Sequence, residues 1–166
     1  MNTLNKLPEY GQSYWLDNLT REMIVNGDLK RRVVQEDLRG ITSNPSTFNK
    51  ALLHSDLYDD QIKELARADL SAGAIYDALV TKDVQDACDI LRPVYDKFNA
   101  LDGYVSLEVS PHLAHDADGT LNEVRRLAKM VGRPNLFIKI PGTEAAVRAI
   151  EEALYEGFNV NITLLF

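Results

Sequence analysis

Short apolar segments alternate with longer segments of helical periodicity along the whole chain. This alternation is typical of α/β proteins, in which helical crossovers join neighbouring parallel strands. We expect strands at residues 13–18, 38–43, 103–109, 137–140 and 159–164. We expect helices at residues 21–27, 28–37, 120–132 and 143–157, and an almost continuous helical region over 46–100.

The spacing of the expected strands favours one kind of parallel sheet. Most strands begin about 25 to 30 residues apart, and about 30 residues is the repeat of a (β/α) barrel. The last strand runs into the end of the sequence, and five strands do not close such a barrel. We therefore expect residues 1–166 to form one partial domain that covers about the first five strands of a (β/α)8 TIM barrel. Truncation or gene fragmentation would account for a partial barrel. An open sheet of this kind exposes its edges and an apolar face, which predicts self-association or partial unfolding.

Four helix starts carry polar residues that suit an N-cap. Thr20 precedes the segment at 21–27, and Asn44 precedes Pro45, a residue that favours the first helical position. Thr120 and Glu123 form the spacing of a capping box, and Thr143 precedes the last helix. We expect each of these helices to begin directly after its cap.

One lysine lies within the apolar strand at 137–140 and is followed by Pro-Gly. An unpaired ammonium costs several kcal/mol to bury, and burial favours the neutral amine. A neutral lysine is a nucleophile suited to Schiff-base chemistry on a carbonyl. The alternative is that Lys139 extends its head into water from the end of the strand.

Further polar residues lie at or just beyond the carboxyl ends of the expected strands. In a parallel barrel these ends face one mouth, where the chemistry takes place. Taken singly, each acid could form a helix cap or a surface ion pair, and Asn44 alone is better explained as a cap. Alternation along the strands places Phe137 with Lys139, and Asn161 with Thr163, on shared sides. We expect one site formed by Asp17, Thr42, Asn44, Glu108, Lys139, Asn161 and Thr163.

This set of side chains suits Schiff-base cleavage of a sugar. A lysine amine that attacks a ketone gives a carbinolamine, which needs a proton donor to lose water. Cleavage of the carbon–carbon bond then needs a base for the substrate hydroxyl, and two carboxylates in different environments can divide these roles. Asn and Thr side chains orient hydroxyls without adding charge. The chemistry requires no metal, because the iminium accepts the electrons.

Composition limits the other function classes. The net charge of −7 argues against a nucleic-acid or anionic-membrane partner. The single cysteine, Cys88, follows the helical apolar pattern and is expected in the core. Residues 1–9 lack the apolar segment of a secretory signal, and no stretch approaches the roughly 18 apolar residues of a spanning helix, so we expect a cytoplasmic protein. His112 and His115 make a weak zinc pattern, since no cysteine lies nearby.

Several segments of the chain resemble the transaldolase family. They are WLDNL at 15–19, GITSNPSTF at 40–48, VSLEV at 105–109, LFIKIPGTE at 136–144 and GFNVNITLLF at 157–166. The resemblance implies a (β/α)8 barrel that transfers a dihydroxyacetone unit from sedoheptulose 7-phosphate to glyceraldehyde 3-phosphate. The products are erythrose 4-phosphate and fructose 6-phosphate, in the pentose phosphate pathway of the cytoplasm and without a cofactor.

The resemblance also implies roles for individual residues. Lys139 would form the Schiff base, Glu108 would act as acid and base through a water, and Asp17 would serve the cleaved hydroxyl. Substrate hydroxyls and the catalytic water would be held by Asn44, Asn161 and Thr163, with Thr42 as a weaker candidate. Transaldolases are about twice as long, and their phosphate-binding arginines lie outside the segments matched here. Two alternatives stay open: a related Schiff-base sugar-phosphate aldolase, and a catalytically incomplete half-barrel that needs a C-terminal half as its assembly partner.

Overall fold

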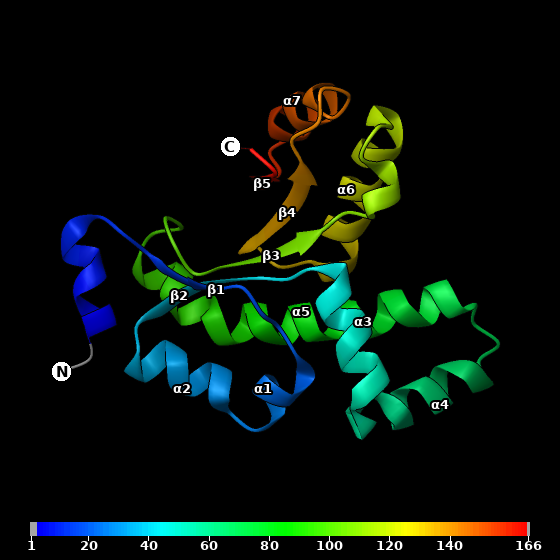
Figure 1. Cartoon of the computed structure of the whole chain (residues 1–166), viewed down its shortest axis with the longest axis horizontal. Helices are drawn as coiled ribbons and strands as arrows, with labels where there is room; N and C mark the ends of the chain where they lie inside the picture. Colours follow the sequence, from blue (N-terminus) through cyan, green and yellow to red (C-terminus); the bar gives the residue numbers. More distant parts are fainter. Residues whose placement is uncertain (1–2, 166) are drawn as a thin grey trace.

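Five parallel strands form a curled half-barrel with helices packed on its outer side (Figure 1). The computed structural model describes residues 3–165. Neighbouring strands in the sheet follow the order of the sequence. Their bounds are β1 (Tyr14–Leu16), β2 (Leu38–Thr42), β3 (Tyr104–Glu108), β4 (Leu136–Pro141) and β5 (Val160–Thr163). The predicted α/β class and parallel sheet are therefore confirmed, and the architecture corresponds to the N-terminal part of a TIM barrel.

The helices cover the outer side of the sheet (Figure 1). The expected helical region at 46–100 is divided because Ser55 caps a new 3₁₀ turn, Asp69 takes a left-handed φ of 57°, and Ser71 caps the next helix. The helices are α1 (Arg21–Val25), α2 (Asp28–Gln35), α3 (Pro45–His54), α4 (Asp59–Arg67), α5 (Ala72–Lys97), α6 (Ala117–Val131) and α7 (Val147–Tyr155). Within residues 3–165 the 3₁₀ segments are η1 (Thr3–Tyr10), η2 (Asp56–Tyr58) and η3 (Pro111–Leu113).

Of the four expected caps, Thr20 fits its helix and Thr143 fits only in part. The Thr20 hydroxyl accepts the Met23 N–H at 3.4 Å, as expected of an N-cap. The Thr143 hydroxyl accepts the Ala146 N–H at 3.1 Å, but it closes a turn that precedes α7.

The expected capping box at Thr120 is wrong. Asp116 caps α6 one turn earlier by accepting the Gly119 N–H at 2.9 Å, so the helix begins at Ala117. Thr120 is buried within the helix and donates its hydroxyl to the Leu113 carbonyl at 2.9 Å. An acidic N-cap with an acid in the first turn outcompetes the later Thr, since both carboxylates favour the helix N-terminus.

The core lies between the outer face of the sheet and the helices. Ile138 and Ile140 alternate with the lysine of β4 and are buried against the helices, as the parity of the strand predicts. The long α5 contacts α1, α2, α4 and α6, as well as β2 and β3. Cys88 on α5 is fully buried in this core, which confirms its prediction as a packing residue.

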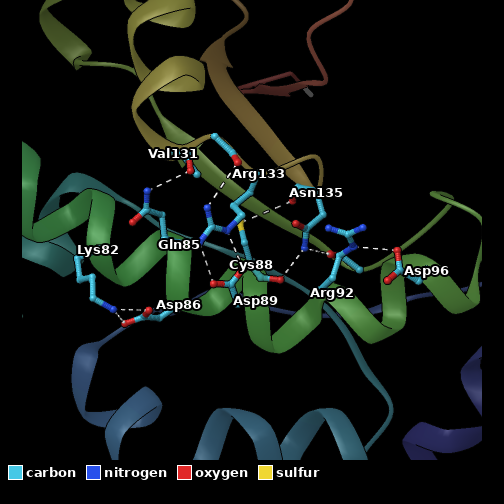
Figure 2. Close-up of polar contacts among 12 residues, drawn as sticks. Lys82, Gln85, Asp86, Cys88, Asp89, Arg92, Asp96, Val131, Arg133 and Asn135 are labelled. Carbon is cyan, nitrogen blue, oxygen red and sulfur yellow. Dashed lines mark hydrogen bonds and ion pairs between the residues drawn. The ribbon is translucent and has the colours of Figure 1, made fainter.

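A fully buried asparagine fastens α5 to the sheet (Figure 2). The Asn135 amide donates to the Cys88 carbonyl and to the Gly103 carbonyl, each at 2.9 Å. Beside it, Arg133 forms an ion pair with Asp89 of α5 at 2.6 Å. These contacts tie the turn before β4 to the middle of α5 and to the start of β3.

Aromatic rings occupy the inner face of the half-barrel. The rings of Tyr104 and Phe137 lie 4.1 Å apart between centroids, and Trp15 lies 6.2 Å from Phe137. A Cβ atom at Gly40 would overlap the Trp15 indole, so glycine is required for the indole to lie across β2. These rings form the floor beneath the polar residues at the carboxyl ends of the strands.

Candidate functional site

The amine of Lys139 lies on the inner face of the half-barrel, in contact with a carboxylate and an amide. Its Nζ is 3.2 Å from Oε2 of Glu108 and donates to Oδ1 of Asn44 at 2.5 Å. Glu108 is the register partner of Lys139 on the neighbouring strand β3, so the two side chains share one face. The sheet therefore brings together the amine and one of the two predicted carboxylates.

The surroundings of Lys139 differ from both environments that the sequence suggested. The side chain is 11% exposed, so it does not extend into water, and its amine has polar partners instead of an apolar wall. A lysine attacks a carbonyl only as the neutral amine, and Glu108 is close enough to exchange a proton with it.

Asn44 connects the amine to the second predicted carboxylate. It occupies the position before Pro45 of α3, but its side chain makes no capping hydrogen bond. The amide oxygen accepts from Lys139, and the amide nitrogen donates to Oδ1 of Asp17 at 3.1 Å. The interpretation of Asn44 as a mere helix cap is therefore wrong, because both ends of its amide are used within the site.

An ion pair fastens the helix that follows the Asp17 loop. Arg21, the first residue of α1, donates to the buried carboxylate of Asp83 on α5 at 2.7 Å. The other oxygen of that carboxylate accepts the Tyr58 hydroxyl at 2.8 Å. Burial raises the pKa of Asp83, although Arg21 opposes this effect. The contact fixes the start of α1 four positions after Asp17.

Asn161 lies on β5 as the register partner of Lys139, so its side chain shares the inner face. Its amide nitrogen donates to the Ser106 hydroxyl at 2.9 Å, which crosses β4 and joins β3 to β5. Sequence reasoning missed Ser106, because a single serine inside an apolar strand gives no signal of its own. The alternation along 105–109, which places Ser106 on the side of Glu108, was the one available indication.

The two predicted threonines lie at the ends of their strands. Thr42 is the register partner of Ser106, and its buried Oγ1 has no hydrogen-bond partner within residues 3–165. Thr163 is the register partner of Pro141 and shares the inner face with Asn161. Five of the seven predicted residues lie at one rim of the half-barrel, at the last position of a strand or within two positions after it: Asp17, Thr42, Asn44, Glu108 and Thr163. Lys139 and Asn161 lie within β4 and β5, where Lys139 is in register with both Glu108 and Asn161.

Two hollows adjoin this rim. An open hollow of about 430 Å³ on the inner side is lined by Trp15, Phe137, Val160, Asn161 and Ile162. A cavity of about 450 Å³ lies between α3, α5, α6 and the end of β3, and Glu108 is among its lining residues. Lys139 is not among the lining residues of either hollow.

The described residues contain no cluster of three or more His, Cys, Asp or Glu side chains arranged to hold a metal ion. His112 and His115 both follow β3, in and just after η3. No helix within residues 3–165 combines the length and apolar character needed to cross a membrane.

The sequence matches a family model described as transaldolase/fructose-6-phosphate aldolase over residues 14–166. The chain belongs to the transaldolase/fructose-6-phosphate aldolase family. Transaldolase 2 of Nostoc sp. is 51% identical over 166 residues, which are 100% of this chain and 44% of that protein. Transaldolase 2 of Nostoc punctiforme is 52% identical over 165 residues, 99% of this chain and 43% of that protein. The transaldolase of Trichodesmium erythraeum is 46% identical over 165 residues, with the same two shares.

This member of the transaldolase family spans less than half the length of these relatives. The matched range includes every residue of the polar rim, from Asp17 on the loop after β1 to Thr163 on β5. The predicted family is therefore confirmed.

Proposed function

We propose that this chain carries the Schiff-base centre of a transaldolase. On this proposal it transfers a dihydroxyacetone unit from sedoheptulose 7-phosphate to glyceraldehyde 3-phosphate, in the pentose phosphate pathway of the cytoplasm. The observation that carries the proposal is the partly buried Lys139 amine, 3.2 Å from the Glu108 carboxylate and 2.5 Å from the Asn44 amide. The transaldolase relatives suggest sugar phosphates as the class of substrate.

The first half of the reaction uses Lys139 and Glu108. Glu108 accepts a proton from the ammonium, and the free amine attacks the ketone carbon to give a carbinolamine. Glu108 then returns the proton, through a water, to the carbinolamine hydroxyl, which leaves as water. The product is an iminium ion on Lys139 that can accept the electron pair of the bond to be broken.

The second half of the reaction uses Asp17. Asp17 removes the proton from the hydroxyl next to the scissile bond, and an aldehyde leaves as the carbon–carbon bond breaks. The electron pair moves onto the iminium and gives a three-carbon enamine on Lys139. Asn44 holds Asp17 at 3.1 Å and thereby orients this base relative to the amine. After the first aldehyde has left, the enamine attacks the acceptor aldehyde. The same steps then run in reverse and release the new sugar from Lys139.

The neutral polar residues would hold the remaining hydroxyls. Asn161 and Thr163 share the inner face of β5, where they can contact the substrate and the catalytic water, and Thr42 offers a buried hydroxyl without a partner among the described residues. Amide and hydroxyl groups suit this role because they donate and accept without a charge.

Borohydride trapping tests the proposal directly. The protein is incubated with fructose 6-phosphate, reduced with borohydride and analysed by peptide mass spectrometry. We expect a dihydroxyacetone-sized adduct on Lys139, and none in Lys139→Met, which keeps a similar chain length without the amine. Folded, soluble protein that gives no adduct would contradict the proposal for the isolated chain.

Two observations favour other functions. The family model includes fructose-6-phosphate aldolases, which suggests an aldolase that releases dihydroxyacetone without an acceptor. Product formation that does not depend on an acceptor aldehyde would identify it. The short span of the chain relative to its relatives suggests a half-barrel that acts only with a C-terminal half. Activity that appears only after addition of the matching C-terminal half of a relative would identify this alternative.

A further inference from the structure

A hydrogen bond crosses the lysine strand on the inner face of the sheet. It joins Asn161 on β5 to Ser106 on β3 at 2.9 Å, although β4 lies between these two strands. Ser106 is in register with Phe137, and Asn161 is in register with Lys139. The bond therefore runs diagonally over β4, from the register position of Phe137 to that of Lys139.

Ser106 is a rigid anchor for this bond. Its residue is fully buried, and its carbonyl accepts both the Ser43 N–H at 3.1 Å and the Ser43 hydroxyl at 2.9 Å. The backbone of Ser106 is thus held on the β2 side, while its hydroxyl reaches toward β5. Asn161, by contrast, belongs to the last strand of the half-barrel and is partly exposed.

We infer that Ser106 is a positioning residue that holds the Asn161 amide against the substrate bound to Lys139. One amide N–H is used by Ser106, which leaves the amide oxygen and the second N–H available to substrate hydroxyls beside the amine. Without the serine hydroxyl, the amide of a strand-edge residue rotates freely and must be ordered when the substrate binds. This inference rests on the proposed function, because it assigns Ser106 a part in the same Schiff-base centre.

The test compares the concentration dependence of adduct formation between variants. The rate of borohydride-trappable adduct on Lys139 is measured against fructose 6-phosphate concentration in wild type, Ser106→Ala, Asn161→Ala and the double variant. Ser43→Ala is the matched control, because it removes a buried serine hydroxyl bonded to the Ser106 carbonyl, while the Ser43 N–H still holds that carbonyl in place. If Ser106→Ala does not fold, Ser106→Cys takes its place, since sulfur fills the space but accepts hydrogen bonds weakly.

We expect Ser106→Ala to raise the half-saturating concentration about fivefold, the effect of one neutral hydrogen bond, with a limiting rate within about twofold of wild type. The double variant should equal Asn161→Ala, since both changes remove the same contact. Ser43→Ala should leave the half-saturating concentration unchanged.

Two results would overturn the inference and leave the proposed function intact. One is a Ser106 variant that behaves like Ser43→Ala. The other is a double variant in which the effects of the Ser106 and Asn161 changes multiply. A wild-type protein that forms no adduct would refute the proposed function and, with it, this inference. The two failures are therefore distinguished by the wild-type measurement.

Discussion

The amine of Lys139 and the amide oxygen of Asn44 lie 2.5 Å apart, although 95 positions separate the two residues along the chain. Asn44 follows β2, which is not a neighbour of β4, since β3 lies between these two strands. The contact is made across β3 on the inner face, where the curl of the sheet brings the strand ends together. Asn44 continues the connection to Asp17, so three of the predicted residues form one chain of hydrogen bonds.

The two carboxylates should stop the reaction at different points. In Asp17→Asn the Schiff base still forms, but the base for the cleaved hydroxyl is missing, so fructose 6-phosphate should leave a six-carbon adduct on Lys139. In Glu108→Gln the lysine loses its proton acceptor, and adduct formation itself should slow by about 10² to 10⁴, the range of general acid–base catalysis. Mass spectrometry of the trapped peptide separates the two outcomes by adduct mass.

The assignment of roles is wrong if Asp17→Asn gives the three-carbon adduct at the wild-type rate. It is also wrong if Glu108→Gln forms any adduct as fast as wild type. Circular dichroism of both variants checks that the amide substitutions leave the fold intact.

Removal of the buried Asn135 amide should destabilise the protein. In Asn135→Ala the carbonyls of Cys88 and Gly103 lose their donor inside the core, which should lower the free energy of unfolding by about 2 to 4 kcal/mol. Asn159→Ala is the matched control: that asparagine also precedes a strand and donates to two carbonyls, at 3.3 and 3.4 Å, but is partly exposed. Urea titration should show a smaller loss for the control, and equal losses would contradict the role of Asn135.

The thiol of Cys88 should make stability fall at alkaline pH. Burial raises its pKa from the ordinary value of 9.0 to about 12, so the unfolded chain loses the proton first. Between about pH 9 and 12 the folded state binds more protons, and the free energy of unfolding therefore decreases as pH rises. Burial also raises the pKa of Tyr58, Tyr76 and Tyr104, which act in the same direction above their ordinary value of 10.0.

Chemical denaturation at a series of pH values measures this decline. Cys88→Ala should remove the decrease in unfolding free energy that begins near pH 9. The decrease caused by the tyrosines should remain. A thiol reagent at pH 8 should label Cys88 in the wild type only in denaturant. Rapid labelling of the folded protein would contradict the burial of this thiol.

The open edge of the sheet should make the isolated chain self-associate. Ile162 and Leu164 at the end of β5 are 38% and 64% exposed, and no further strand among the described residues lies beside β5. A free strand edge flanked by apolar side chains favours pairing with another chain. We expect Ile162→Lys with Leu164→Asp to shift sedimentation toward the monomer. Aspartate suits position 164 because its φ is 63°.

The matched control places the same charges elsewhere. Val34 and Leu53 are 73% and 78% exposed on α2 and α3, so Val34→Lys with Leu53→Asp adds one positive and one negative charge away from β5. This control should sediment as the wild type does. A wild-type protein that is monomeric and melts in one sharp transition would refute self-association.

Local patterns predicted much of this fold, because strand parity and helical periodicity are set by neighbouring residues. The inner position of Phe137 and Lys139 and the buried Ile138 and Ile140 follow from alternation alone. Contacts between distant segments could not be predicted in this way. Asn44 has a capping signal in the sequence, but its side-chain oxygen accepts from Lys139 of β4 and makes no capping bond with the α3 backbone. Ser106 and Asn135 act through partners 55 and 32 to 47 positions away, which no local pattern reports.

The sequential order of the strands has a consequence for how the site is completed during synthesis. Each new strand pairs with the one made just before it, so a growing chain can extend the sheet by one edge at a time. Asp17, Asn44 and Glu108 are in place once β3 is added, but the proposed nucleophile, Lys139, arrives only with β4. A nascent chain that ends before residue 139 therefore has both carboxylates but lacks the Lys139 amine. On the proposed mechanism, the Schiff-base centre is assembled only when β4 joins the sheet.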